Sequence, residues 1–133
     1  MSTVKIIKTF FSDSRGKIID IFSKKNFQHC SIVTFKKNSV RGNHFHKKSI
    51  QSAYIINGNF RVLSVKVDKK FNYDTEDVEN IRAKIGDYIT HYKFEAHTYK
   101  CLSKNGRLIV FTSGLRGGEQ YEEDTFKLKK NLI

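Results

Sequence analysis

The chain has 133 residues, of which 38% are hydrophobic and 29% are charged, proportions typical of a soluble globular protein. This length predicts one domain, residues 1–133. No apolar run approaches the roughly 20 residues that cross a bilayer, and the N-terminus lacks a signal-peptide pattern. We therefore expect a cytoplasmic protein that has no membrane partner.

Basic side chains dominate the charge. Lysine and arginine account for 25 residues against 13 aspartates and glutamates, which gives a formal net charge of +12. Such a field attracts anions. The lysines are scattered and do not form one basic block, and no zinc-finger, helix-turn-helix or RNA-recognition pattern is present. A phosphorylated small molecule fits this pattern, and we expect no nucleic-acid partner.

Short apolar runs separated by turn residues predict strands along most of the chain. The first two runs, residues 4–11 and 17–22, flank a turn cluster at 12–16 and predict a hairpin. Further strands are predicted, in chain order, over residues 30–36, 40–46, 51–57, 59–67, 81–85, 88–91, 96–102 and 107–113. Asn57-Gly58 is a strong hairpin-turn signal between two of them.

Two segments depart from the strand pattern. Residues 68–80 are acidic and lack apolar periodicity, which predicts a surface loop with a short helical turn. Residues 119–133 are predicted to form a last strand or a docked tail. Regularly spaced short strands without a long helical period predict an all-β sandwich or barrel of antiparallel strands.

The strongest chemical signal is a pair of histidines in the run 40–46. His44 and His46 are two residues apart, so their side chains share one face of a strand. Two imidazoles on one face can hold one metal ion or act together on one substrate. The longer string is His44-x-His46-x4-Gln51-x6-Gly58, and His97 follows later in the chain.

This string resembles the first motif of the cupins, G-x5-H-x-H-x3–4-E-x6-G, and His97 matches the histidine of their second motif. The resemblance implies a single-domain cupin jelly roll or β-barrel of antiparallel strands. In metal-binding cupins three histidines and a glutamate hold the ion, and the matching residues here are His44, His46, Gln51 and His97. Because Gln51 replaces the carboxylate, a divalent cation should bind less well. We therefore favour a site that has no metal.

Two strings indicate a narrower group. Residues 13–16 read Asp-Ser-Arg-Gly and precede an apolar run, and residues 41–51 read RGNHFHKKSIQ. These resemble the D-x-R-G turn and the R-G-x-H-A-H-K-K-x-x-Q motif of the sugar-nucleotide cupins, which are dTDP-sugar 3,4-ketoisomerases and dTDP-4-dehydrorhamnose 3,5-epimerases. Ketoisomerases end in an acidic segment with a Tyr-Asp pair, and residues 114–124 here are acidic and contain Tyr121.

The resemblance implies an isomerase or epimerase of a nucleotide-diphosphate-linked 4-keto sugar in polysaccharide biosynthesis. A histidine suits proton abstraction through an enolate because its pKa lies near working pH. The implied catalytic residues are His44 as base, His46 as acid or relay, and Gln51 and Tyr99 as donors to the enolate. The implied substrate-binding residues are Arg15, Arg41, His97 and Tyr54. No cofactor is required, and related cupins are commonly homodimers.

Other interpretations remain open at this point. One is a metal-dependent cupin enzyme, and another is a cupin that binds a sugar or nucleotide without turnover. The sequence does not separate 3,4-ketoisomerisation from 3,5-epimerisation. His29 and His91 are interpreted as strand-end or surface residues that have no role in the site.

Overall fold

The structure, a computed structural model, describes residues 3–7, 9–114 and 123–133. Its described part contains two five-stranded sheets in which every pairing is antiparallel. The first sheet has the order β1 (Thr3–Ile6), β9 (Asp87–His91), β6 (Ile50–Asn57), β11 (Asn105–Ser113) and β4 (His29–Lys36). The second has the order β12 (Phe126–Lys127), β5 (Val40–Phe45), β10 (Glu95–Cys101), β7 (Phe60–Lys66) and β8 (Glu79–Ala83).

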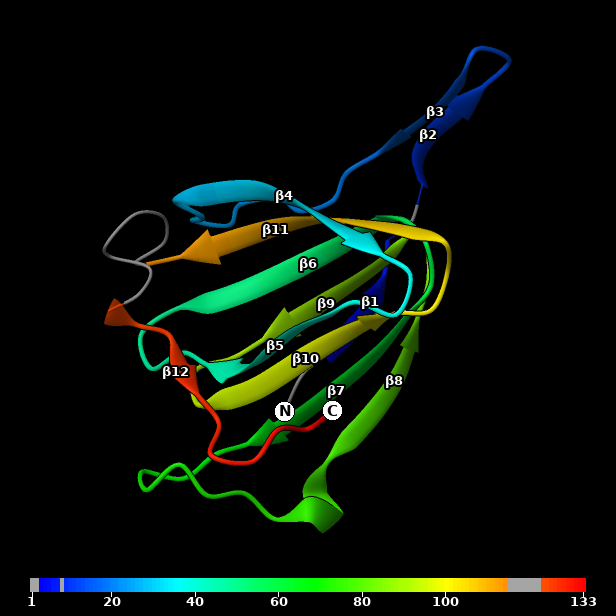
Figure 1. The fold of residues 1–133 in the computed structure, drawn as a ribbon. Coiled ribbons are helices and arrows are strands. Elements are labelled where there is room, and N and C mark those ends of the chain that lie inside the picture. Colours follow the sequence, from blue (N-terminus) through cyan, green and yellow to red (C-terminus); the bar gives the residue numbers. More distant parts are fainter. Residues whose placement is uncertain (1–2, 8, 115–122) are drawn as a thin grey trace.

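The two sheets stack face to face, and the main core lies between them (Figure 1). Alternating residues of both sheets supply it, including Ile55 and Ile89 from the first sheet and Phe60 and Val62 from the second. All four are fully buried, and each large apolar side chain buried in this way contributes about 1.5–3 kcal/mol. The all-β jelly roll predicted from the sequence is confirmed. The sheets do not close into a true barrel, so that part of the prediction is corrected.

Most predicted strands are confirmed with ends shifted by one or two residues. Two predictions differ by more. The predicted strand 17–22 ends three residues early, at Ile19, and the predicted strand 4–11 is not continuous. It divides into β1, which pairs with β9, and β2 (Thr9–Asp13), which pairs with β3 (Gly16–Ile19) in a separate hairpin. Apolar content alone could not locate this break, because both pieces are equally rich in Val, Ile and Phe. The hairpin projects away from the two sheets (Figure 1).

The loop and the tail also follow the prediction. Residues 68–78 form an exposed loop whose one helical turn, Thr75–Asp77, is capped by the Asp74 side chain. No helix in the described part of the chain is long and apolar enough to cross a membrane. The last residues form β12 and then a docked tail, whose Leu128 packs on Phe45 over the outer face of the second sheet.

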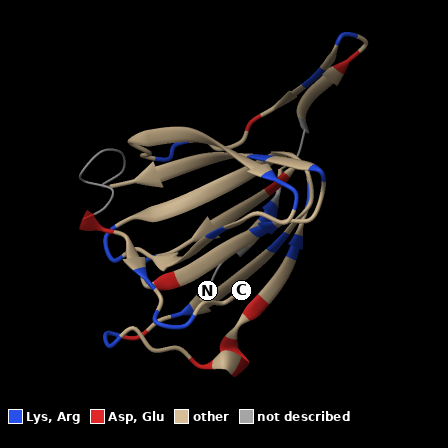
Figure 2. Ribbon diagram, viewed as in Figure 1, with Lys and Arg blue, Asp and Glu red and all other residues tan. Residues whose placement is uncertain are grey.

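Charged side chains are distributed unevenly. Acidic residues gather around the loop before β8, whereas Lys and Arg are spread over the strands of both sheets and the β2–β3 hairpin (Figure 2). This agrees with the scatter of lysines in the sequence.

Candidate active site

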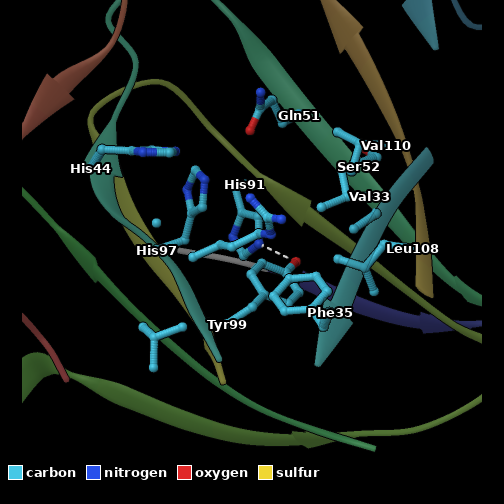
Figure 3. Close-up of a pocket in the computed structure, with 14 residues that line it drawn as sticks. Val33, Phe35, His44, Gln51, Ser52, His91, His97, Tyr99, Leu108 and Val110 are labelled. Atoms are coloured by element: carbon cyan, nitrogen blue, oxygen red, sulfur yellow. Dashed lines mark hydrogen bonds between the residues drawn. The ribbon is translucent and has the colours of Figure 1, made fainter. Parts of the chain in front are cut away.

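A cavity of about 470 Å³ opens between the two sheets. Its apolar lining residues are Val33, Phe35, Val40, Ala53, Leu108 and Val110. Its polar lining residues are Arg41, His44, Gln51, Ser52, His91, His97 and Tyr99. Figure 3 shows His44 and His97 of the second sheet opposite Val33, Leu108 and Val110 of the first, and Gln51 also points into the cavity. An apolar pocket with a few converging polar groups is the usual form of a small-molecule site.

A β-bulge in β5 places Arg41 and His44 on the same wall. Residues three apart on a regular strand face opposite sides. Here His44 pairs with His97 and Arg41 pairs with Tyr99, so three steps along β5 match two along β10. Gly42 and Asn43 make the bulge with φ values of +117° and +56°. Position 42 requires glycine, because the Cβ of any other residue would lie 2.5 Å from the carbonyl oxygen of His97.

Three histidines meet at this wall, as the sequence predicts. The ring centroid of His44 lies 5.0 Å from that of His46 and 5.0 Å from that of His97. Nitrogen atoms from the three side chains all lie within 4.8 Å of one another. His44 is half-buried, and the other two are buried. Such a set can act on one substrate or supply three nitrogen ligands to a metal ion.

Backbone carbonyls fix the hydrogen positions on two of these rings. Nδ1 of His46 lies 2.7 Å from the Asp124 oxygen, and Nδ1 of His97 lies 3.3 Å from the Glu95 oxygen. A carbonyl only accepts, so Nδ1 carries the hydrogen and Nε2 keeps its lone pair when the ring is neutral. Burial, followed by the charges of the neighbouring histidines, holds the pKa of His97 well below its usual value. His97 is therefore neutral at pH 7.

Asp124 holds the segment that carries His46. Its buried carboxylate accepts hydrogen bonds from the backbone amides of Lys47 and Lys48 and from the Ser49 hydroxyl. Its carbonyl oxygen accepts from His46. The sequence analysis did not single out Asp124, because its partners are 75 to 78 residues away in the chain.

Tyr99 reaches the cavity wall, but its hydroxyl is engaged. The hydroxyl lies 2.6 Å from Nε2 of His91 (Figure 3). Nδ1 of His91 lies 3.8 Å from the Glu95 carboxylate. Burial raises the pKa of Tyr99 strongly, and the Glu95 charge adds to this, so the phenol is neutral. Burial lowers the pKa of His91, although Glu95 acts in the opposite direction. His91 ends β9, as the strand-end prediction has it, but its placement on the surface is wrong, since its exposed fraction is 3%.

Gln51 and Arg41 also lie where the sequence predicts. Gln51 is buried and lines the cavity from β6. The Arg41 guanidinium stands over the Phe35 ring at 5.4 Å and donates to the Thr34 oxygen through Nε and Nη2. A guanidinium has five N–H donors, so further donors are available to a ligand.

Two predicted binding residues are not brought to this cavity. Tyr54 packs with Tyr88 and Phe111 in a separate cluster, because alternation along β6 turns it away from Ala53 and Ile55, which face the core. Arg15 stands at the exposed end of the β2–β3 hairpin, where it pairs with the Asp13 carboxylate at 2.6 Å. This guanidinium lowers the pKa of Asp13. Tyr121 lies outside the described residues.

His91 and Glu95 belong to the site although the sequence analysis missed their part in it. A signal was available, because Glu95, His97 and Tyr99 alternate on β10 and therefore share its inner face. Charged residues are almost never fully buried unless they are paired. A glutamate in such a buried run therefore implies a partner.

The chain matches a protein family by sequence and several solved structures by fold. A family model described as the polysaccharide biosynthesis C-terminal domain matches residues 11–113. No curated protein matches the chain. Among solved structures, a dTDP-4-dehydrorhamnose 3,5-epimerase from Elizabethkingia anophelis is 15% identical, with a TM-score of 0.73, over 90% of this chain and 72% of its own.

Ketoisomerases share the same architecture. A 3,4-ketoisomerase from Helicobacter canadensis is 16% identical, with a TM-score of 0.75, over 95% of this chain and 90% of its own. A sugar 3,4-ketoisomerase from Thermoanaerobacterium thermosaccharolyticum, solved in complex with TDP, is 17% identical, with a TM-score of 0.75, over 96% and 88%. At these identities the likeness is one of fold.

Proposed function

The chain belongs to the polysaccharide biosynthesis C-terminal domain family, and from this membership we propose that it is an isomerase or epimerase of a nucleotide-diphosphate-linked 4-keto sugar. The observation that carries the proposal is the pairing of His44 with His97 on one wall of the cavity. Structural neighbours include a dTDP-4-dehydrorhamnose 3,5-epimerase, a 3,4-ketoisomerase and a sugar 3,4-ketoisomerase solved with TDP.

We propose that His44 removes the proton next to the ketone. The C–H electron pair then forms the C3=C4 double bond, and the negative charge moves to the C4 oxygen as an enolate. Return of a proton to C3 from the other face gives an epimer. Protonation at C4, with transfer of the O3 proton to the C4 oxygen, gives a 3-keto isomer instead. His46, held by Asp124, serves as the acid or relay. This route requires no cofactor.

The donors to the enolate oxygen differ from the pair that the resemblance implies, Gln51 and Tyr99. In the arrangement described, Tyr99 donates to His91, and neutral His97 presents an acceptor. Gln51 has an amide N–H₂ group and is therefore assigned as the enolate donor. His97 accepts from a sugar hydroxyl, and Arg41 binds the diphosphate through its remaining N–H groups.

We further propose that the protein works as a homodimer. The β2–β3 hairpin exposes Phe10 and Ile18, with exposed fractions of 71% and 53%. Adjacent exposed apolar side chains on a projecting element are typical of a contact surface. Arg15 does not line the cavity of its own copy. In a dimer packed through the hairpin, Arg15 would reach the diphosphate bound in the cavity of the second copy. A single domain over residues 1–133 and a cytoplasmic location complete the proposal.

A metal-dependent enzyme is the second candidate, and the three converging histidines favour it. His44, His46 and His97 would hold the ion, with the Gln51 amide oxygen as a fourth ligand. A bound ion would supply a Lewis acid at the ketone oxygen.

Turnover of dTDP-4-keto-6-deoxyglucose tests the proposal. Chelator-treated protein is expected to convert the sugar to an isomer or epimer that NMR identifies, and His44→Asn is expected to lose this activity. Activity that returns only with added metal would favour the metal-dependent enzyme. Tight binding of the sugar nucleotide without conversion would instead indicate a binding module and overturn the proposal.

A further inference from the structure

His91, the last residue of β9, is held by contacts at both ring nitrogens. Nε2 lies 2.6 Å from the Tyr99 hydroxyl, and Nδ1 lies 3.8 Å from the Glu95 carboxylate. All three side chains are buried, with exposed fractions of 2% to 6%. The proposed reaction gives His91 and Glu95 no role.

These contacts define both the tautomer and the plane of the His91 ring. An ionised carboxylate only accepts, so Nδ1–H points at Glu95, and Nε2 accepts the Tyr99 O–H. Rotation of the ring would break the contact with Tyr99 and would leave a buried polar group without its partner. Such a loss is unfavourable, because the group gives up its partner without regaining water. The His91 ring is therefore a fixed surface inside the protein.

His97 rests on that surface. The two rings are stacked, with centroids 4.3 Å apart and planes 15° from parallel. The hydrogen bond that holds His97 itself, from Nδ1 to the Glu95 oxygen, is long at 3.3 Å. That bond alone restrains the ring weakly. The stacking contact supplies the remaining restraint on the direction in which Nε2 points.

We propose that His91, clamped by Glu95 and Tyr99, is a positioning residue that holds the His97 ring in its substrate-binding orientation. The expected change in kcat rests on the proposed function, whereas the orientation of the His97 ring rests on geometry alone. His97 lies opposite His44, with ring centroids 5.0 Å apart, so a tilt of His97 would displace the sugar from the base. A displacement of 1 Å can cost about 100-fold in rate.

kcat and KM should respond differently, because contacts to the sugar ring and contacts to the rest of the substrate act on different parameters. His97 touches the sugar ring, whereas most binding free energy for a nucleotide sugar comes from the distant diphosphate and nucleoside. Loosening His97 should therefore lower kcat and leave KM nearly unchanged. A partly unfolded population would also lower the apparent kcat without changing KM, so kcat is expressed per folded protein, with the folded fraction measured by urea unfolding.

The main test compares Tyr99→Phe with Tyr88→Phe. Tyr99→Phe keeps the aromatic ring and its contact with His97, and it removes only the hydroxyl that bonds to His91. An effect on His97 must therefore pass through His91. Tyr88→Phe makes the same chemical change at a tyrosine that does not line the cavity. We expect Tyr99→Phe to lower kcat about 10-fold or more, within the range for misplaced groups, with KM within about two-fold. Tyr88→Phe should change neither parameter.

A readout that does not depend on turnover is the ¹⁵N–¹H NMR signal of His97 Nδ1–H. It should be sharp and slow to exchange in the wild type and in Tyr88→Phe, and broadened in Tyr99→Phe and His91→Ala. Glu95→Gln keeps an acceptor for His91 and should preserve the signal, whereas Glu95→Ala should lose it. An unchanged His97 signal in both Tyr99→Phe and His91→Ala would overturn the inference. If the wild type has no activity, the proposed function fails, and this NMR comparison still decides the positioning role.

Discussion

Substitution of Gly42 by alanine tests how tightly β5 approaches β10. The new Cβ would lie 2.5 Å from the His97 oxygen and 2.8 Å from the Thr98 Cα, whereas ordinary contact begins at 3.4 Å. Both obstacles are backbone atoms, so a side-chain rotation cannot relieve them. The strands must separate by about 0.9 Å, which stretches the hydrogen bonds on both sides of the bulge.

The expected cost has two parts. A non-glycine residue at φ +117° costs about 1–3 kcal/mol, and forced overpacking costs about another 1–3 kcal/mol. Gly16→Ala is the matched control, because Gly16 has φ +133° and nothing within 4 Å of its Cβ position. Gly42→Ala should therefore lower the free energy of unfolding by about 1–3 kcal/mol more than Gly16→Ala does.

Urea unfolding monitored by tyrosine fluorescence measures both variants. Because the separation also moves His44 relative to His97, we expect kcat of Gly42→Ala to fall by about 100-fold, whereas Gly16→Ala should retain its kcat. Equal free energies of unfolding for the two variants, within about 0.5 kcal/mol, would refute the argument that a steric contact requires glycine in β5.

Three further predictions concern pH, a buried carboxylate and the hairpin. The pKa of His97 is lowered in the folded state, so the unfolded state binds more protons below about pH 6.5, and stability should fall with decreasing pH by up to about 1.4 kcal/mol per pH unit for this residue. Urea midpoints between pH 7 and 5 check this, and His97→Gln should flatten the slope. Asp124→Asn replaces an acceptor oxygen with a donor amide, so we expect a loss of about 2–3 kcal/mol in urea unfolding and a shifted His46 ring signal in NMR. Replacing Phe10 and Ile18 by serine should convert the proposed dimer to a monomer of unchanged fold in sedimentation equilibrium.

Each of these predictions has a contrary result. A pH slope that is the same in wild type and His97→Gln would show that other groups cause it. An Asp124→Asn protein as stable as the wild type would mean that the three donors find other acceptors. A wild-type monomer, or a dimer that survives both serine substitutions, would remove the hairpin from the proposed interface.

The strands were predictable because their signals are local. Apolar alternation and the turn residues at 12–16 and 57–58 locate most strand ends within two residues. The pairing of β1 with β9 was not predictable, because it depends on a strand more than 80 residues later in the chain. Nothing local separates β1 from β2.

The site shows the same division. His44 and His46 share a face because two-residue spacing on a strand requires it, and the structure brings His97 to them. Tyr54 was assigned by residue type alone, and its parity on β6 turns it away. His91 was interpreted as a strand-end or surface residue, although its partners come from another strand, β10. Contacts between strands that lie far apart or belong to different sheets leave little trace in one sequence.

The most direct measurement of the central claim is the position of deuterium in dTDP-4-keto-6-deoxyglucose after incubation with chelator-treated protein in deuterated water. The account predicts loss of the C3 proton signal in the wild type and in the His29→Asn control, and its retention in His44→Asn. Additional loss at C5 would identify a 3,5-epimerase. No exchange in the wild type, or equal exchange in wild type and His44→Asn, would contradict the assignment of this cavity as an enolising active site.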